Sequence, residues 1–254
     1  KASTKRKITM ELKSWVEIPD SVPHMTEAEE LQRDAIIKLH QTYWAEYEDI
    51  LRSVKICDPA CGSGAFLNQC FDFLHEEMNF VLDMKHQFDE DKASFSLFDI
   101  DKQILQNNLF GVDINPESVE ITKLSLWLKT AKQNQTLASL DDNIKCGNSI
   151  VDDPHVAGSL AFHWQEQFPT VFANGGFDVI VGNPPYGATV DNVQKEYINN
   201  KYSTAEGNFD TYRIFFELGF DILKPNGYLG YITPNTYFDL KRSGTKLRKF
   251  LFTN

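Results

Sequence analysis

A short apolar stretch followed by two consecutive prolines constrains the fold of this chain more than any other feature. Residues 177–181 have the pattern of a buried strand, and Asn-Pro-Pro-Tyr (183–186) follows as a loop. Ligands of open α/β sheets bind at the carboxyl ends of the strands. The prolines keep the loop extended and remove two amide donors, so the loop offers acceptors beside an aromatic face. This pattern predicts a site for a planar amine. A rigid turn with a packed tyrosine is the alternative interpretation.

A glycine-containing segment follows the first predicted strand. Residues 54–57 indicate a short buried strand, and residues 58–67 lead from it into a helix that we expect to end near Asp83. Gly62 and Gly64 allow the backbone to turn sharply and to approach a ligand, at which the N-terminus of the next helix points. A strand before the glycines and a helix after them is the context that such a loop requires.

An acidic residue ends the second predicted strand, at residues 109–113. In nucleotide-binding α/β folds, an acid at this position holds the ribose hydroxyls, which makes Asp113 a candidate ligand. The same position is compatible with an N-cap, and Asn115 or Ser118 is also expected to cap the next helix. Asp113 follows the glycines after more residues than is usual in such folds. We explain the delay by a polar surface insertion at residues 83–106.

The second half of the chain is predicted to complete the sheet. The polar segment 187–208 indicates a mobile loop over the site. The other predicted elements, in chain order, are a third short strand and turn at 143–149, an amphipathic helix at 210–223, a break at 224–227 and a fifth strand at 228–233.

The composition limits the possible partners. The chain has 36 acidic and 25 basic residues and a net charge of -11. Free-standing nucleic-acid binders are normally basic, so this charge favours a catalytic core whose main nucleic-acid contacts lie elsewhere. No apolar run is long enough to cross a membrane, and the start lacks a secretory signal pattern. The four cysteines and six histidines lack metal-site spacing, which indicates reduced thiols in a cytoplasmic protein without a zinc site.

Several motifs occur in the order that one enzyme family shows. They lie at residues 58–67, 109–128, 146–149 and 183–186, and residues 210–235 match a fifth. Together they resemble the S-adenosylmethionine-dependent N6-adenine DNA methyltransferases, above all the fused restriction–modification enzymes of type IIG. The resemblance implies the α/β fold of class I S-adenosylmethionine-dependent methyltransferases, a Rossmann-like parallel sheet with five strands present and the C-terminal strands missing.

The resemblance also implies how the chain is organised. Residues 1–50 would form an N-terminal helical extension. Residues 51–254 would form a truncated catalytic core, without the target-recognition domain, so that the chain is a fragment of a larger protein. A tyrosine-threonine-proline motif that relatives carry ahead of the glycine loop is not found in this sequence.

The resemblance assigns roles to individual residues. Asn148 stands where many relatives carry an aspartate, and its Oδ1 can still accept a hydrogen bond. Phe215 has a place in the helix core as its alternative. The catalytic residues implied are Asn183, Pro184, Pro185 and Tyr186. The cofactor-binding residues implied are Asp58, Ala60, Cys61, Gly62 and Gly64 for the methionine end, Asp113 for the ribose, and Ile114, Asn148 and Phe215 for the adenine.

The implied activity is metal-independent methyl transfer from S-adenosylmethionine to the N6 amine of an adenine flipped out of DNA. It would serve a bacterial or archaeal restriction–modification or related defence system. DNA would be recognised mostly by parts of the protein outside this chain, and the exposed fifth strand would allow self-association. One alternative is a methyltransferase acting on a protein glutamine amide or a ribosomal RNA base, which needs the same grip on an amine. The other is a non-catalytic scaffold that binds the cofactor.

Overall fold

The computed structural model describes residues 27–88, 97–130, 139–205, 209–235 and 245–253. The chain divides into two compact units, Lys1–Tyr43 and Trp44–Asn254. The described residues of the first unit belong to the beginning of helix α2 (Glu27–Ser53). None of the described helices combines the length and the apolar character that a membrane span needs.

A parallel sheet forms the centre of the second unit. The described residues contain five strands: β1 (Ile56–Asp58), β2 (Leu109–Asp113), β3 (Ile144–Cys146), β4 (Phe177–Gly182) and β5 (Leu223–Tyr231). Their spatial order is β3-β2-β1-β4-β5. The chain therefore builds outward from β1 to β3 and then returns to the other side of β1. This order confirms the predicted Rossmann-like parallel sheet, and it places the switch point between β1 and β4, where such folds bind ligands.

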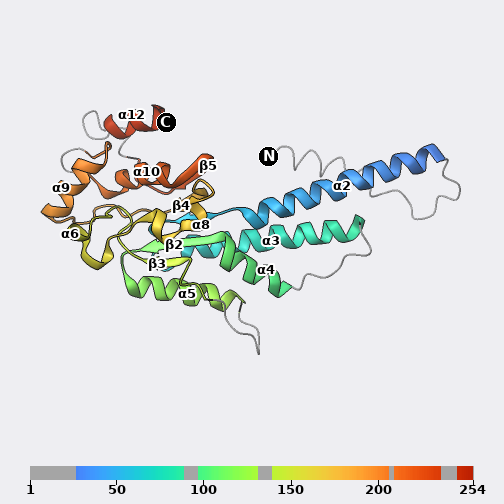
Figure 1. Cartoon of the computed structure of the whole chain (residues 1–254), viewed down its shortest axis with the longest axis horizontal. Coiled ribbons are helices and arrows are strands. Elements are labelled where there is room, and N and C mark those ends of the chain that lie inside the picture. The colour runs from blue at the N-terminus through green and yellow to red at the C-terminus, as the bar shows by residue number, and fades with distance from the viewer. Residues whose placement is uncertain (1–26, 89–96, 131–138, 206–208, 236–244, 254) are drawn as a thin grey trace. The chain divides into compact units, whose positions relative to one another are not determined.

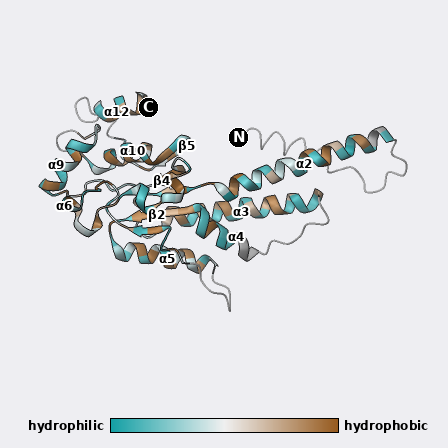
Figure 2. Cartoon of the chain, in the orientation of Figure 1, coloured by the Kyte–Doolittle hydropathy of each residue, from teal (hydrophilic) through white to brown (hydrophobic). Residues whose placement is uncertain are grey.

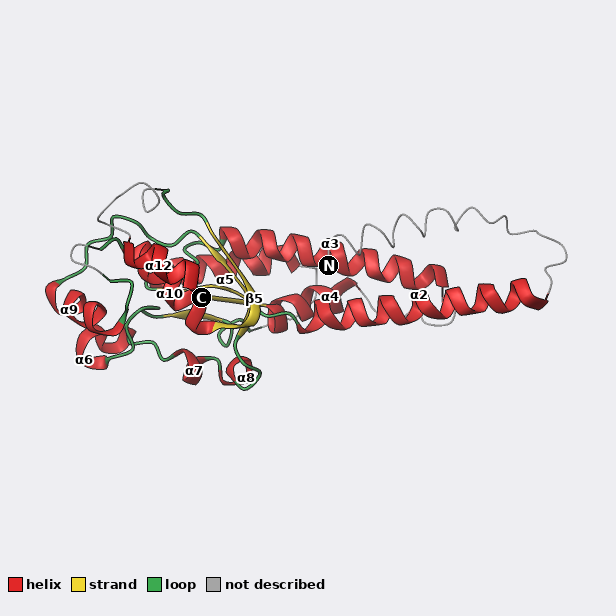
Figure 3. Cartoon of the chain, turned by 90° about the horizontal axis from the view of Figure 1, so that it is seen from above, coloured by secondary structure: helices red, strands yellow, loops and turns green. Residues whose placement is uncertain are grey.

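Helices cover both faces of this sheet. Helices α3 (Ala65–Phe88) and α5 (Pro116–Thr130) lie on one face and α10 (Thr211–Ile222) on the other (Figure 1). Figure 3, seen from above, shows many loops of this unit gathered beyond one end of the strands. The other elements are α4 (Leu97–Gln103), the π-helical turn η1 (Ile104–Asn108), α6 (Pro154–Ala157), the 3-10 turn η2 (Gly158–Leu160), α7 (Trp164–Gln167), α8 (Pro169–Phe172), α9 (Asn192–Lys201) and α12 (Thr245–Thr253).

An aromatic cluster fills the space on the α10 face of the sheet. Phe110, Phe168 and Phe177 meet edge to face, with ring centroids 5.4 to 5.7 Å apart. Such pairs each contribute about 0.5–1.5 kcal/mol beyond simple burial. Trp164 belongs to the same cluster and its Nε1 donates to the Ser149 carbonyl at 2.9 Å, so the one polar atom of the indole is satisfied. Figure 2 shows the matching hydrophobic colour along the strands.

The second unit also includes the end of α2. Trp44 is 1% exposed and meets Phe80 of α3 edge to face, at 5.6 Å between ring centroids. The Tyr47 hydroxyl donates to Glu77 of α3 at 2.6 Å. These contacts hold the last turns of α2 along α3.

The predicted surface insertion at residues 83–106 is wrong for the residues that the structure describes. Helix α3 continues to Phe88, and residues 89–96 lie outside the described part. Beyond them, Ile100, Ile104 and Leu105 are at most 2% exposed. Apolar residues at helical spacing among acidic neighbours therefore form a buried face, which outweighs the polar composition of the segment.

The structure also corrects two boundaries in the second half. The predicted mobile loop at 187–208 contains α9, whose Ile198 is fully buried and whose Asp191 caps the helix by accepting from the Gln194 amide. The fifth strand begins at Leu223 and includes the predicted break at 224–227, because a register shift between β4 and β5 accommodates the extra residues. β5 is one of the two edge strands of the described sheet.

Candidate active site

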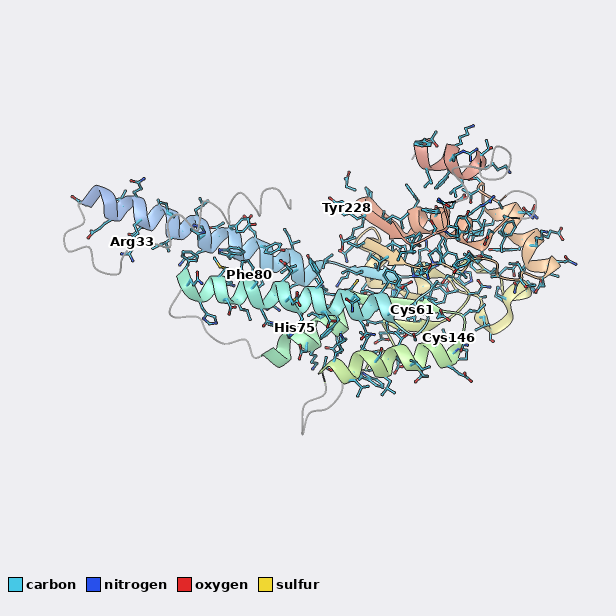
Figure 4. The ribbon with its side chains drawn as sticks, turned by 180° about the vertical axis from the view of Figure 1, so that it is seen from behind. Arg33, Cys61, His75, Phe80, Cys146 and Tyr228 are labelled. Atoms are coloured by element: carbon cyan, nitrogen blue, oxygen red, sulfur yellow. The ribbon has the colours of Figure 1, made fainter. Side chains whose placement is uncertain are left out.

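The predicted motifs meet at the carboxyl edge of the sheet. The last residues of β1 and β2 are Asp58 and Asp113, and β4 ends at Gly182. Asp113 is directly opposite Cys146, the last residue of β3. Figure 4 labels Cys61, in the loop after β1, and Cys146, at the end of β3. Because the strands are parallel, the loops that follow them all lie at the same end of the sheet, beyond the carboxyl ends of the strands.

The loop after β1 depends on its glycines. Gly62 and Gly64 have φ angles of +53° and +84°, a region that favours glycine. A Cβ at Gly64 would also lie 2.8 Å from a methyl carbon of Thr122 in α5. Thr122 in turn donates its hydroxyl to the Gly62 carbonyl at 2.8 Å. The loop is therefore folded tightly against the first turns of α5.

Asp113 connects this loop to the second strand. Its Oδ2 accepts from the Gly62 amide at 2.8 Å, and its Oδ1 accepts from the Asn115 amide at 2.9 Å. Asn115 itself caps α5, since its Oδ1 accepts from the Glu117 amide at 2.8 Å. Each Asp113 oxygen keeps a lone pair for a further donor, as a bound hydroxyl would require.

Asp58 is a nearly buried carboxylate with 1% exposure. Burial raises its pKa to about 7; the Ala60 amide opposes this shift, and the negative charge of Asp113 adds to it. Oδ1 accepts from the Ala60 amide at 3.0 Å. A Cβ on Gly182 would lie 2.6 Å from the same oxygen, so β4 ends directly against this carboxylate. A buried carboxylate with one amide donor is suited to pair with a cationic group.

The loop after β4 exposes the side chains of Asn183 and Tyr186, and its start is held by a backbone hydrogen bond. The Asn183 side chain is exposed, and its side-chain amide has no hydrogen-bond partner among the described residues. Pro184 is buried. The Tyr186 side chain is 63% exposed. The Gly182 carbonyl accepts from the Ile232 amide at 3.0 Å, which joins the end of β4 to the segment after β5. The loop therefore offers an amide oxygen and a ring to a substrate.

The remaining predicted residues differ in accessibility. Ile114 is 52% exposed next to Asp113. Asn148 is 8% exposed, and its Oδ1 accepts from the Ile150 amide at 3.3 Å. Phe215 is 6% exposed and belongs to the core cluster on the α10 face. Its ring is thus enclosed by protein, and its contact with a cofactor adenine stays a prediction.

Three hydroxyl side chains that hold these loops were not predicted from the sequence. Ser149 donates to the Pro59 carbonyl at 2.6 Å, and Thr211 donates to the Pro185 carbonyl at 2.6 Å. Thr122 does the same for the glycine loop. All three lie within or beside the matched motifs. That position is the one signal in the sequence that marks them, because their partners are far away along the chain.

The cysteines are free thiols. Burial raises the pKa of Cys57 and of Cys61, so both stay protonated near neutral pH. In the described ranges, no three His, Cys, Asp or Glu side chains are grouped as a metal site requires. A hollow of about 340 Å³, lined by Lys55, Asn107 and Asp142 among others, lies at the amino ends of the strands and is separate from the loops above.

The chain is similar in sequence to known restriction-modification and adenine-specific methyltransferases. A family model described as the Eco57I restriction-modification methylase matches residues 107–254. The chain is 34% identical over 227 residues to the type II restriction enzyme and methyltransferase RM.Eco57I of Escherichia coli, covering 81% of this chain and 22% of that protein. It is 24% identical over 247 residues to the adenine-specific methyltransferase PglX of Streptomyces coelicolor, covering 79% and 18%.

A solved structure shares the fold. The nuclease-deletion mutant of the type ISP restriction-modification enzyme LlaGI, in complex with a DNA substrate mimic, has a TM-score of 0.55 at 18% identity. The match covers 79% of this chain and 17% of that one. The chain thus spans about a fifth of the length of these relatives.

Proposed function

Because this chain belongs to the Eco57I restriction-modification methylase family, we propose that it transfers a methyl group from S-adenosylmethionine to the N6 amine of an adenine in DNA. The observation that carries the proposal is the contact between Asp58 and Gly182. It brings a glycine loop suited to the cofactor against a loop suited to a planar amine. The restriction-modification relatives support DNA as the substrate class.

The residues of the carboxyl edge fit the cofactor. The Asp58 carboxylate matches the ammonium of its methionine part, and Gly62 and Gly64 present backbone without a side chain in the way. Asp113 has free acceptor capacity for the ribose hydroxyls, and the exposed Ile114 offers an apolar surface to the adenine ring. When bound, S-adenosylmethionine supplies an electrophilic methyl group, and no metal is needed for that chemistry.

The loop after β4 fits the amine that receives the methyl group. The exocyclic nitrogen of adenine is a poor nucleophile because its lone pair is delocalised into the ring. Asn183 Oδ1 and the Pro184 carbonyl would accept both amine hydrogens, which favours a pyramidal nitrogen with a directed lone pair. Orienting reactants in this way contributes up to about 7–11 kcal/mol in favourable cases. A strong base is not required, since the amine proton is acidic once the methyl group is attached.

The adenine must leave the duplex to reach this loop. Flipping a base costs roughly a few kcal/mol. The exposed ring of Tyr186 would offset part of this through stacking, which is worth about 1–3 kcal/mol per base in single-strand binders. The net charge of -11 fits a core to which other parts of the protein bring the DNA.

Two accompanying proposals concern the setting of this activity. We place the enzyme in the bacterial or archaeal cytoplasm, where restriction-modification enzymes meet DNA. The edge strand β5, with Tyr228 72% exposed, would allow pairing with a further strand or with a second copy.

One alternative function uses a different substrate, because the same loop would also bind a glutamine amide or a ribosomal RNA base. The other alternative is a scaffold that binds the cofactor and transfers no methyl group. The test incubates the full-length protein with methyl-tritiated cofactor and DNA, ribosomal RNA or a release factor. We expect label in DNA, recovered as N6-methyladenine. The Asn183→Ala variant should lose the label but keep its cofactor affinity in calorimetry.

An exposed asparagine outside the site provides the control. Asn174 lies in the turn after α8 and donates to the Thr170 carbonyl at 2.8 Å, so Asn174→Ala should methylate DNA at the wild-type rate. Label in RNA or release factor alone would favour the competing substrate. Cofactor binding without transfer to any of the three would favour the scaffold.

A further inference from the structure

The first turn of α10 holds the loop that carries Tyr186. The hydroxyl of Thr211 donates to the Pro185 carbonyl at 2.6 Å, and Asp210 Oδ1 accepts from the Gly187 amide at 2.9 Å. These two bonds fix the peptide groups immediately before and after Tyr186. The Tyr186 side chain is 63% exposed, yet its backbone is anchored on both sides.

Asp210 occupies the N-cap position of α10, but its side chain does not form the capping hydrogen bond. Aspartate at this position normally accepts from the amide two or three residues later. Here no side-chain cap bond forms, and the carboxylate reaches back to Gly187 instead. The two other N-cap aspartates of the described chain behave differently: Asp153 accepts from the His155 amide and Asp191 from the Gln194 amide. The geometry at Asp210 therefore serves the loop and not the helix.

The anchor itself is rigid. Thr211 is 4% exposed, and the residues that follow it in α10, from Tyr212 to Phe216, are all buried. The helix packs against the core cluster through Ile214 and Phe215. Hydrogen bonds from the first turn of α10 therefore restrict the motion of the loop that carries Tyr186.

We propose that Asp210 and Thr211 are positioning residues for the target base, since they hold the backbone of Tyr186 where its ring stacks on an extruded adenine. This inference rests on the proposed function. It assigns Asp210 and Thr211 to capture of the base and not to cofactor binding. Loss of either bond leaves the tyrosine present but its loop free to move.

The test compares two pairs of variants in the full-length protein. Thr211→Val removes the hydroxyl at nearly constant shape and Thr211→Ser keeps it, while Asp210→Ala removes the acceptor and Asp210→Asn keeps an oxygen for Gly187. Losing one hydrogen bond should lower kcat/KM for DNA about threefold to tenfold in T211V and D210A. T211S and D210N should stay within about twofold of wild type, because the bonds are kept. The dissociation constant for S-adenosylmethionine should not change in any of the four.

Matched controls separate positioning from general loss of structure. Thr130→Val removes a buried hydroxyl that donates to the Trp127 carbonyl inside α5, and Asp153→Ala removes the cap of α6. Both should leave kcat/KM for DNA unchanged. The inference is overturned if T211V and D210A methylate DNA normally, if their cofactor affinity falls in parallel, or if T211S and D210N do not restore the rate.

The outcome also distinguishes this inference from the proposed function. A wild-type protein that does not methylate DNA overturns both. A wild-type protein that does so, with Asn183→Ala inactive and T211V normal, overturns the positioning role alone.

Discussion

The carboxylate of Asp58 occupies the space that a side chain on Gly182 would need. Oδ1 lies 2.6 Å from the position of a Cβ on Gly182, closer than real Cβ contacts come. Asp58 ends β1 and Gly182 ends β4, the two strands between which the chain changes direction. The contact therefore joins the loop suited to the cofactor to the loop suited to the acceptor.

Gly182→Ala should separate these two loops. The added methyl group must displace either the buried Asp58 or the end of β4, which we expect to lower the free energy of unfolding by about 1–3 kcal/mol. Methyl transfer should slow at least tenfold, because even a small displacement of the reacting groups lowers the rate strongly. Urea denaturation and initial rates provide the measurements.

Gly230→Ala is the matched control. Gly230 lies in β5, opposite Val181 of β4, and a Cβ there would meet no heavy atom within 4 Å. This variant should keep wild-type stability within about 0.5 kcal/mol and wild-type activity. Equal effects of the two substitutions would contradict the role given to the Asp58–Gly182 contact.

Asp58 should make the stability of the protein depend on pH. Its folded-state pKa of about 7 lies above the value of 3.8 expected when unfolded, because burial disfavours the charged form. Between these values the folded state binds more protons, so the stability contributed by Asp58 is greatest below pH 3.8 and falls as the pH rises to about 7. Asp58→Asn removes this dependence while its Oδ1 can still accept from Ala60.

We therefore expect the free energy of unfolding of the D58N variant, relative to that of wild type, to increase as the pH rises. The gain between pH 5 and pH 8 should be about 2–3 kcal/mol, from the linkage between pKa and folding. Urea denaturation of the cofactor-free proteins at the two pH values measures it. A difference that stays constant with pH would show that Asp58 is already ionised in the folded state.

Cofactor binding should release protons near pH 7. An ammonium paired with Asp58 favours the carboxylate and lowers its pKa from about 7. About half a proton per bound S-adenosylmethionine should then be released at pH 7. Calorimetry in phosphate and in Tris, which differ in ionisation enthalpy, measures the number. The D58N variant should release none through this site, and equal release by both proteins would exclude the pairing.

Tyr186→Ala should weaken capture of DNA more than binding of cofactor. Losing one stacking partner costs about 1–3 kcal/mol, which corresponds to a fivefold to 150-fold rise in KM for DNA. Tyr186→Phe keeps the ring and should remain close to wild type. Tyr228→Ala, which removes an exposed tyrosine from the edge strand, is the control for loss of a surface aromatic residue. A change in cofactor affinity as large as the change in KM would argue against stacking.

Local sequence patterns were sufficient to place the motifs on the sheet. The second strand was predicted at residues 109–113 and is found there, and the strands before Asp58 and Asn183 differ from the prediction by one or two residues. Apolar runs that end in glycine or an acid fix where a strand stops. Parallel strands then place their carboxyl ends at one edge, which is why the candidate residues are neighbours.

Other features could not be predicted because they depend on distant partners. Residues 224–227 contain Pro-Asn-Gly, which is typical of a turn, and the shifted register with β4 is what keeps them in β5. The segment 187–208 is polar, and its helix is held by Asp152, which pairs with Lys201 at 2.7 Å. Thr122 and Thr211 bond to loops 60 and 26 residues away, separations that no local pattern encodes.

The strand order described above has an evolutionary consequence. The residues proposed for the methyl donor lie at the ends of β1, β2 and β3, with Phe215 of α10 as the exception, whereas those proposed for the acceptor follow β4 on the other side of the boundary between β1 and β4. Selection could therefore alter the loop after β4 to admit a different amine without changing the loops after β1, β2 and β3. A directed-evolution library confined to residues 183–191 would exploit this separation.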